Sequence, residues 1–148
     1  MTVPRPGLGS PWIGYATCAW TAIFAAPHIW WALGSPVAFP DGDANYRVFM
    51  SATWRIAYDW VVVFLSFTGF GVALALVRPW GRAIPRLPLH ALAWLAFGIL
   101  TLRGVAGLAV DGLADPIWSP GFLVGGLLFG GVAWRAHRLG KAHPAAES

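Results

Sequence analysis

Four ionisable side chains lie inside, or at the ends of, long apolar stretches of this sequence. They are His28, Arg55, Asp59 and Arg103. An ionised group in hydrocarbon costs about 2.5–3.5 kcal/mol on insertion scales, so it normally faces protein or water and has a partner. Histidine exchanges a proton near neutral pH, and an aspartate held by an arginine stays ionised. These residue types predict acid–base chemistry by His28 or Asp59, with Arg55 and Arg103 holding an anionic or oxygenated group.

Helical spacing places these groups in polar stripes on three different helices, the third of which carries Arg103 and Asp111. Arg55 and Asp59 are four residues apart, and Thr21 and His28 are seven apart, so each pair shares one helix face. Lipid does not solvate such stripes, and a bundle would turn them inward. We therefore expect a polar and aromatic pocket near one end of the bundle. Its other expected binding residues are Trp31, Trp54, Tyr58, Asp111, Asp115 and Trp118.

The same charges also have a purely structural interpretation. Arg103 and Asp59 would then form a buried ion pair that fixes the register of the helices. Arg55 would extend its guanidinium to the membrane interface, and His28 would hydrogen-bond a neighbouring helix. Both interpretations predict that Arg103 meets Asp59, and they differ in whether the pair also serves a ligand.

The composition places these residues in a membrane protein. Of 148 residues, 57% are hydrophobic and 11% are charged, whereas about 25% of residues in soluble domains are charged. The formal net charge of +4 does not indicate nucleic-acid binding, because the basic residues lie at the ends of apolar runs and form no patch interleaved with aromatics. We expect one transmembrane domain that covers residues 1–148.

Four apolar runs are each close to the roughly 20 residues that cross a bilayer. The expected spans are 11–33, 54–77, 87–110 and 117–134. They predict an all-α, integral membrane four-helix bundle with a loop from 34 to 53. Arginine and lysine concentrate in the link 78–86 and in the tail after the last span, so the positive-inside rule puts both termini in the cytoplasm. The preference for arginine over lysine, with much Ala, Gly and Pro, favours a bacterial inner membrane.

Small residues four apart in the last span indicate close helix packing. Gly121 and Gly125 are one such pair, and Gly126 and Gly130 are another. Glycines at this spacing let helix backbones approach each other in lipid. The spacing predicts packing inside the bundle, or alternatively a homodimer through this glycine-rich face.

Several kinds of chemistry lack the residues they need. Cys18 is the single cysteine, so the chain has no internal disulfide or thiol-redox pair. His28 and His90 fall on opposite sides of the predicted membrane, which excludes a two-histidine haem or zinc site. The sequence contains no glycine-rich phosphate loop and no serine nucleophile elbow. We expect neither a metal nor a cofactor.

Two short motifs resemble those of a family of small bacterial four-helix membrane proteins, a domain of unknown function. They are the segment His28–Gly34, which reads His-Ile-Trp-Trp-Ala-Leu-Gly, and the segment Asp115–Pro120, which follows Arg103-Gly. The resemblance covers about residues 14–135. It implies the four-helix bundle and directs attention to His28, Arg103, Trp118 and Ser119, but it carries no activity.

These observations favour a pocket near the outer leaflet that binds or transforms a membrane lipid or isoprenoid. Cyclisation or isomerisation fits, because neither reaction needs a metal or a nucleotide. A non-enzymatic accessory or assembly subunit is the first alternative. A dimeric carrier of a small solute or protons is the second.

Overall fold

A computed structural model describes residues 11–39, 42–112 and 116–141, except for the side chains of Asp111 and Lys141. The described residues form α1 (Trp12–Ala32), α2 (Gly42–Met50), α3 (Thr53–Val77), the 3-10 helix η1 (Pro79–Ala83), α4 (Arg86–Asp111) and α5 (Trp118–Lys141). No strand occurs among them. The all-α prediction is therefore confirmed, and each expected span corresponds to one long helix.

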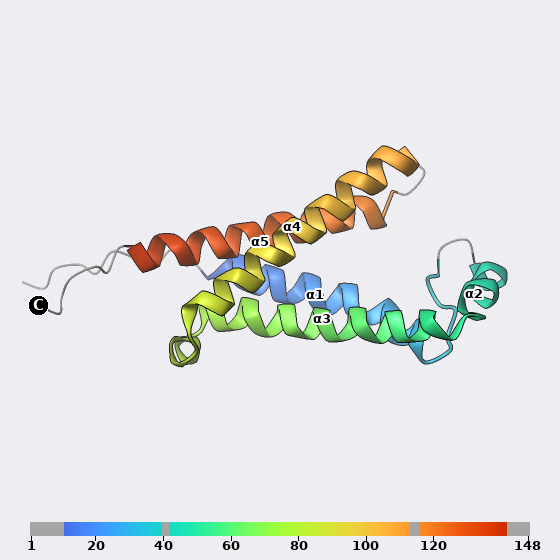
Figure 1. Ribbon diagram of the computed structural model, residues 1–148, viewed down its shortest axis with the longest axis horizontal. Coiled ribbons are helices and arrows are strands. Elements are labelled where there is room, and N and C mark those ends of the chain that lie inside the picture. The colour runs from blue at the N-terminus through green and yellow to red at the C-terminus, as the bar shows by residue number, and fades with distance from the viewer. Residues whose placement is uncertain (1–10, 40–41, 113–115, 142–148) are drawn as a thin grey trace, which may run out of the picture.

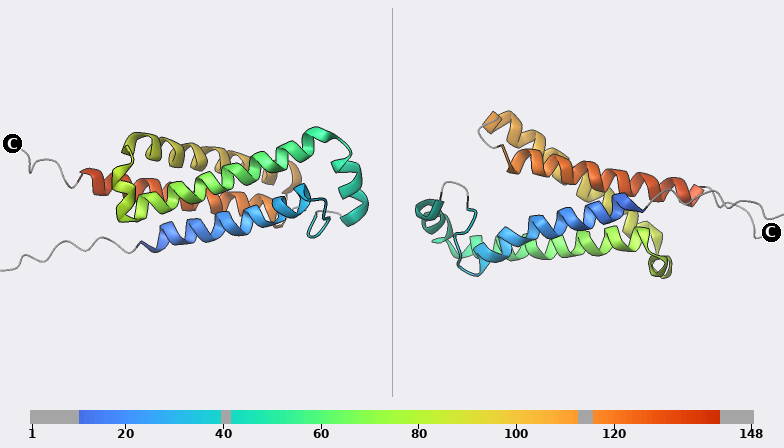
Figure 2. Two further views of the ribbon diagram at one scale, coloured as in Figure 1. Left: turned by 90° about the horizontal axis from the view of Figure 1, so that it is seen from below. Right: turned by 180° about the vertical axis from the view of Figure 1, so that it is seen from behind.

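The four long helices are arranged as two antiparallel pairs (Figure 1). α1 packs along α3, and α4 packs along α5, and these are the two most extensive helix contacts. The pairs meet near η1 and separate toward the end that carries α2, as the right-hand view of Figure 2 also shows. The architecture is thus two helical hairpins joined at one end.

A cluster of buried apolar residues joins the two pairs at the η1 end. It consists of Val72, Ala75, Leu89, Ala93, Phe129 and Ala133. These residues come from the C-terminal half of α3, the start of α4 and the later part of α5. Small alanine side chains let the helices approach closely here, which explains why the pairs converge at this end.

The glycines of α5 pack inside the molecule. A methyl group added at Gly126 would overlap Thr101 of α4, and one added at Gly125 would overlap the indole of Trp20 in α1. The prediction that the glycine spacing serves internal packing is confirmed at these positions. Glycine also ends α4, where Gly112 adopts a φ of 58°, a left-handed conformation that side chains rarely tolerate.

One prediction about the helix boundaries is wrong. The segment between α1 and α3 is not only a loop, because α2 lies across the end of that helix pair (Figure 1). Tyr46 is the buried residue of α2, so the segment lacks the apolar run that marks the other helices. α5 continues to Lys141, beyond the expected span end at 134, and the position at which a span would end within this helix stays a prediction.

Within the described part of the chain, two helices are long and apolar enough to cross a membrane: α3, and α4 as far as Val110. The 25 residues of α3 extend about 37 Å at 1.5 Å per residue, beyond the ~30 Å of hydrocarbon in a bilayer. Their most apolar stretches are only 22% and 17% buried. Most residues of these stretches are therefore not buried by the rest of the chain.

The α4–α5 contact gives a first prediction. Gly126→Ala adds a methyl group that overlaps Thr101, whereas Gly121→Ala on the same helix meets nothing within 4 Å. We expect Gly126→Ala to destabilise the protein by about 1–3 kcal/mol, the usual cost of overpacking, and Gly121→Ala to be neutral or slightly stabilising. Unfolding of the two variants in detergent, followed by circular dichroism, measures the difference. Equal unfolding midpoints would contradict the packing described here.

Candidate functional site

A buried histidine–aspartate pair joins α1 to α3. The Nδ1 atom of His28 lies 2.8 Å from Oδ1 of Asp59, and the residues are 7% and 2% exposed. With Asp59 ionised, the Nδ1–H group donates this hydrogen bond, which fixes the ring and leaves Nε2 as the nitrogen that can exchange a proton. Nε2 makes no hydrogen bond within the described part of the chain.

The predicted ion pair between Arg103 and Asp59 is wrong. His28 pairs with Oδ1 of Asp59. The other carboxylate oxygen, Oδ2, is buried without a hydrogen-bond partner among the described residues. His28 can reach Asp59 because α1 and α3 pack along each other over much of their length. Arg103 lies on α4, which contacts α3 much less. The pairing of helices therefore decides which residue meets the aspartate.

The polar stripe predicted on α1 does face inward. Thr17 and Thr21 are 0% and 2% exposed, and their hydroxyls donate to backbone oxygens of α1 at 2.7 Å for Ile13 and 2.8 Å for Cys18. The hydroxyls are thus satisfied by their own helix. His28, about two turns beyond Thr21 on this face, is the residue of the stripe that reaches a different helix.

Aromatic rings enclose the His28 imidazole. The ring centroids of Phe24, Trp31 and Trp118 lie 5.2, 4.8 and 6.1 Å from that of His28. Trp31 and Trp118 also contact each other, with centroids 5.3 Å apart. Two of the expected site tryptophans are therefore beside the histidine, and they restrict the access of water to it.

An aromatic cap from the α1–α3 connection covers this end, and sequence reasoning missed it. The Tyr46 hydroxyl donates to the backbone oxygen of Trp31 at 2.9 Å, and the Trp31 indole donates to that of Val37 at 2.9 Å. Phe39 packs against both Trp31 and Tyr46. The aromatic residues of this connection are the sequence feature that could have indicated the cap. Which side chains they contact, however, depends on how α2 packs against the end of α1.

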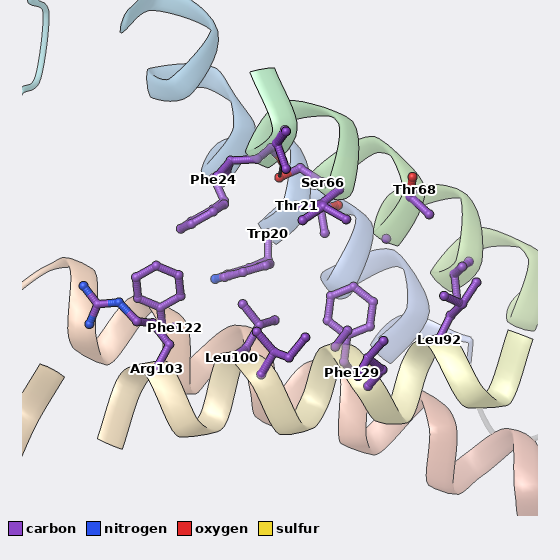
Figure 3. Close-up of a pocket in the computed structure, with 18 of the residues that line it drawn as sticks. Trp20, Thr21, Phe24, Ser66, Thr68, Leu92, Leu100, Arg103, Phe122 and Phe129 are labelled. Carbon is purple, nitrogen blue, oxygen red and sulfur yellow. Dashed lines mark hydrogen bonds between the residues drawn. The ribbon is translucent and has the colours of Figure 1, made fainter. Parts of the chain in front are cut away.

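A cavity of about 370 Å³ lies between the two helix pairs (Figure 3). All four long helices line it. Its apolar walls include Trp20, Phe24, Val61, Leu65, Val72, Leu92, Leu95, Ile99, Leu100, Phe122 and Phe129, and its polar lining consists of Thr21, His28, Tyr58, Ser66, Thr68 and Arg103. We call this cavity the cleft. It combines a long apolar surface with a few polar groups, the usual form of a ligand site.

Most hydroxyls in the cleft are already engaged. Ser66 donates to the backbone oxygen of Val62 and Thr68 to that of Phe64, both at 2.9 Å. Thr21 is satisfied within α1. Three polar side chains of the lining therefore have groups to offer a ligand, namely His28, Tyr58 and Arg103.

The structure separates the two arginines that were expected to act together. Arg103 lines the cleft, with its guanidinium 5.1 Å from the Phe122 ring centroid. Arg55 instead stacks over Phe49 at 3.8 Å and over Trp54 at 4.5 Å. Neither Arg55 nor Trp54 is among the residues that line the cleft. Trp31 and Trp118 do not line the cleft either, so a role of these four residues in binding a ligand stays a prediction.

The remaining expected binding residues are the two aspartates of the α4–α5 connection. Asp111 is the last residue of α4, and its side chain lies outside the described residues, as does Asp115. Among the described residues, no group of three or more His, Cys, Asp or Glu side chains could hold a metal ion.

Comparison of this chain with protein-family models, with curated proteins and with solved structures finds no match. The resemblance to a family of small four-helix membrane proteins therefore stays a prediction. What the site does has to be inferred from its own geometry.

The aromatic cap gives a prediction about pH. Burial raises the pKa of the Tyr46 phenol above its ordinary value, and the negative charge of Asp59 raises it further. The fold therefore favours the neutral phenol, whose contribution to stability is complete below about pH 10 and is lost as the pH rises through the raised pKa. Tyr46→Phe loses the hydrogen bond to Trp31, at about 1 kcal/mol, but cannot ionise.

We expect the free energy of unfolding to fall more steeply for wild type than for Tyr46→Phe above about pH 10. Unfolding in detergent at a series of pH values measures this. Two curves that stay parallel throughout the alkaline range would contradict the assignment of a buried, neutral Tyr46.

Proposed function

We propose that the protein is a multi-pass protein of a bacterial inner membrane, in which α1, α3, α4 and α5 all cross the bilayer. The outward-facing apolar surfaces of α3 and α4 support this, because soluble monomers rarely expose contiguous apolar patches of more than a few hundred Å². α1 and α5 pack antiparallel to these helices and are 21 and 24 residues long. They would cross the membrane together with their partners.

The distribution of arginines supports an orientation with both termini in the cytoplasm. Arg78, Arg82 and Arg86 lie in and around η1, and Arg135 and Arg138 lie in the last part of α5, at the same end of the molecule (Figure 1). Positively charged residues are retained on the cytoplasmic side. The α2 end would then face the periplasm, and α2 would lie along the outer membrane interface.

In this orientation the cleft binds the apolar chain of a membrane lipid or isoprenoid. The observation that carries this is the cleft itself, which is lined mainly by apolar side chains and has His28, Tyr58 and Arg103 toward the α2 end. Its deeper part lies between α3 and α4 at Val72 and Leu92. An amphipathic molecule would enter from the outer leaflet with its polar end near His28.

The His28–Asp59 pair would then act as an acid–base group on the bound molecule. Asp59 holds the imidazole by one nitrogen, so Nε2 takes up or delivers a proton at a fixed position. The enclosing aromatic rings exclude water and can stabilise developing positive charge. Cyclisation or isomerisation of an unsaturated chain needs only such proton transfers.

The alternatives have less support. Gly125 and Gly126 of α5 pack against α1 and α4, so these two glycines are not free to form the face of a homodimer or to bind an assembly partner. A dimeric carrier of a small solute or protons stays a prediction.

Two alanines of α4 provide a matched test. Ala96 lines the cleft, whereas Ala91 is exposed and does not line it. We expect wild type and Ala91→Phe, purified from membranes, to retain a lipid or isoprenoid, and Ala96→Phe to lose most of it. Mass spectrometry of the extracted lipids measures retention, and thermal unfolding shows that both variants are folded. Equal retention by the two variants would contradict binding in the cleft.

The same extracts test the chemistry. His28→Gln should still retain a lipid, but chromatography should resolve a composition different from wild type, because unconverted substrate remains bound. An unchanged composition would contradict the acid–base role and leave a binding protein.

A further inference from the structure

Arg103 carries a charge that no anion of the described chain neutralises. Its guanidinium rests on the Phe122 ring, and no carboxylate of the described residues lies within ion-pair distance. Asp59, the acid expected to pair with it, is held by His28 on the other helix pair. A charge in this position needs a counter-charge from elsewhere.

The position of Arg103 along α4 strengthens the argument for a counter-charge, because it places the residue deep in the proposed membrane. It lies eight residues before the C-terminal end of α4, which is about 12 Å at 1.5 Å per residue. In the proposed bilayer this places its Cα within hydrocarbon, where an arginine normally pairs with another group or borders a water-filled cavity. The side chain is exposed and borders the cleft.

The surroundings of Arg103 keep its guanidinium available. Gly107, one turn further along α4, leaves it space, because a methyl group there would come within 2.9 Å of a terminal nitrogen of Arg103. Figure 3 shows the guanidinium beside the Phe122 ring, clear of the other labelled side chains. A ring contact covers one face of the planar group and leaves the N–H groups at its edge for a planar or tetrahedral anion.

We propose that the ligand of the cleft has an anionic head, a phosphate or a carboxylate, that binds Arg103, and a single apolar chain. This rests on the proposed function, since it requires that the cleft holds an amphiphile. Along α4 the lining continues from Arg103 to Leu92, about 16 Å at the helical rise. The volume of about 370 Å³ is near the lower limit of roughly 300 Å³ for ligand pockets, which suits one chain.

The test compares probes that share a chain and differ in charge. Dodecyl phosphate, dodecanol and inorganic phosphate are titrated into the full-length protein in a neutral detergent by calorimetry. We expect wild type to bind dodecyl phosphate about tenfold or more tightly than dodecanol, as hydrogen bonds between charged groups allow. Arg103→Gln should remove this preference without weakening dodecanol binding. Arg55→Gln is the matched control, because Arg55 stacks outside the cleft, and it should keep the preference.

The outcomes separate this inference from the function on which it rests. If wild type binds neither amphiphile, the cleft is not a lipid site and the proposed function fails. If wild type and Arg103→Gln bind both amphiphiles equally, the cleft binds chains but Arg103 does not select an anionic head. If inorganic phosphate competes as well as dodecyl phosphate does, the anion is a free ion and not a lipid head.

Discussion

The exposed apolar surface of α3 and α4 is the constraint on which the rest of the structure depends. Less than a quarter of the most apolar stretch of each helix is buried within the chain, and lipid can cover what remains. In lipid, however, helices are not driven together by the hydrophobic effect, so close contacts must hold them. Glycines provide such contacts along the α4–α5 pair, and between the two pairs the buried apolar cluster around Phe129 provides them at the η1 end. In the proposed bilayer, the helix pairs can separate at the other end, because exposed apolar walls cost little in lipid.

Because Asp59 pairs with His28, no ion pair from Asp59 closes the cleft between the two helix pairs. An ion pair between Asp59 and Arg103 would have tied α3 to α4 across the cleft. The observed bond to His28 instead lies within the α1–α3 pair, and it leaves Arg103 on the opposite side with no counter-charge among the described residues. One hydrogen bond therefore accounts for two features of the site: a histidine oriented for proton transfer and an arginine available to a ligand.

The sequence predicts the long helices well, because apolar length and charge placement depend on the chain alone. It also predicts that His28, Asp59 and Arg103 lie at similar depths. It cannot predict which two of them meet, since this depends on the rotation of each helix and on how the helices pair. Arg55 shows the same limit. The composition of the sequence does not predict α2, and it is α2 that places the Phe49 ring against the Arg55 guanidinium.

Cysteine accessibility in intact bacterial cells tests the membrane arrangement most directly. Cys18 is buried, so single cysteines can be introduced at Ser51, between α2 and α3, and at Ala83, the last residue of η1, both of which are exposed. A membrane-impermeant maleimide should label Ser51→Cys in intact cells and Ala83→Cys only after the membrane is opened. Equal labelling of the two positions in intact cells, or recovery of the chain in the soluble fraction, would contradict the account.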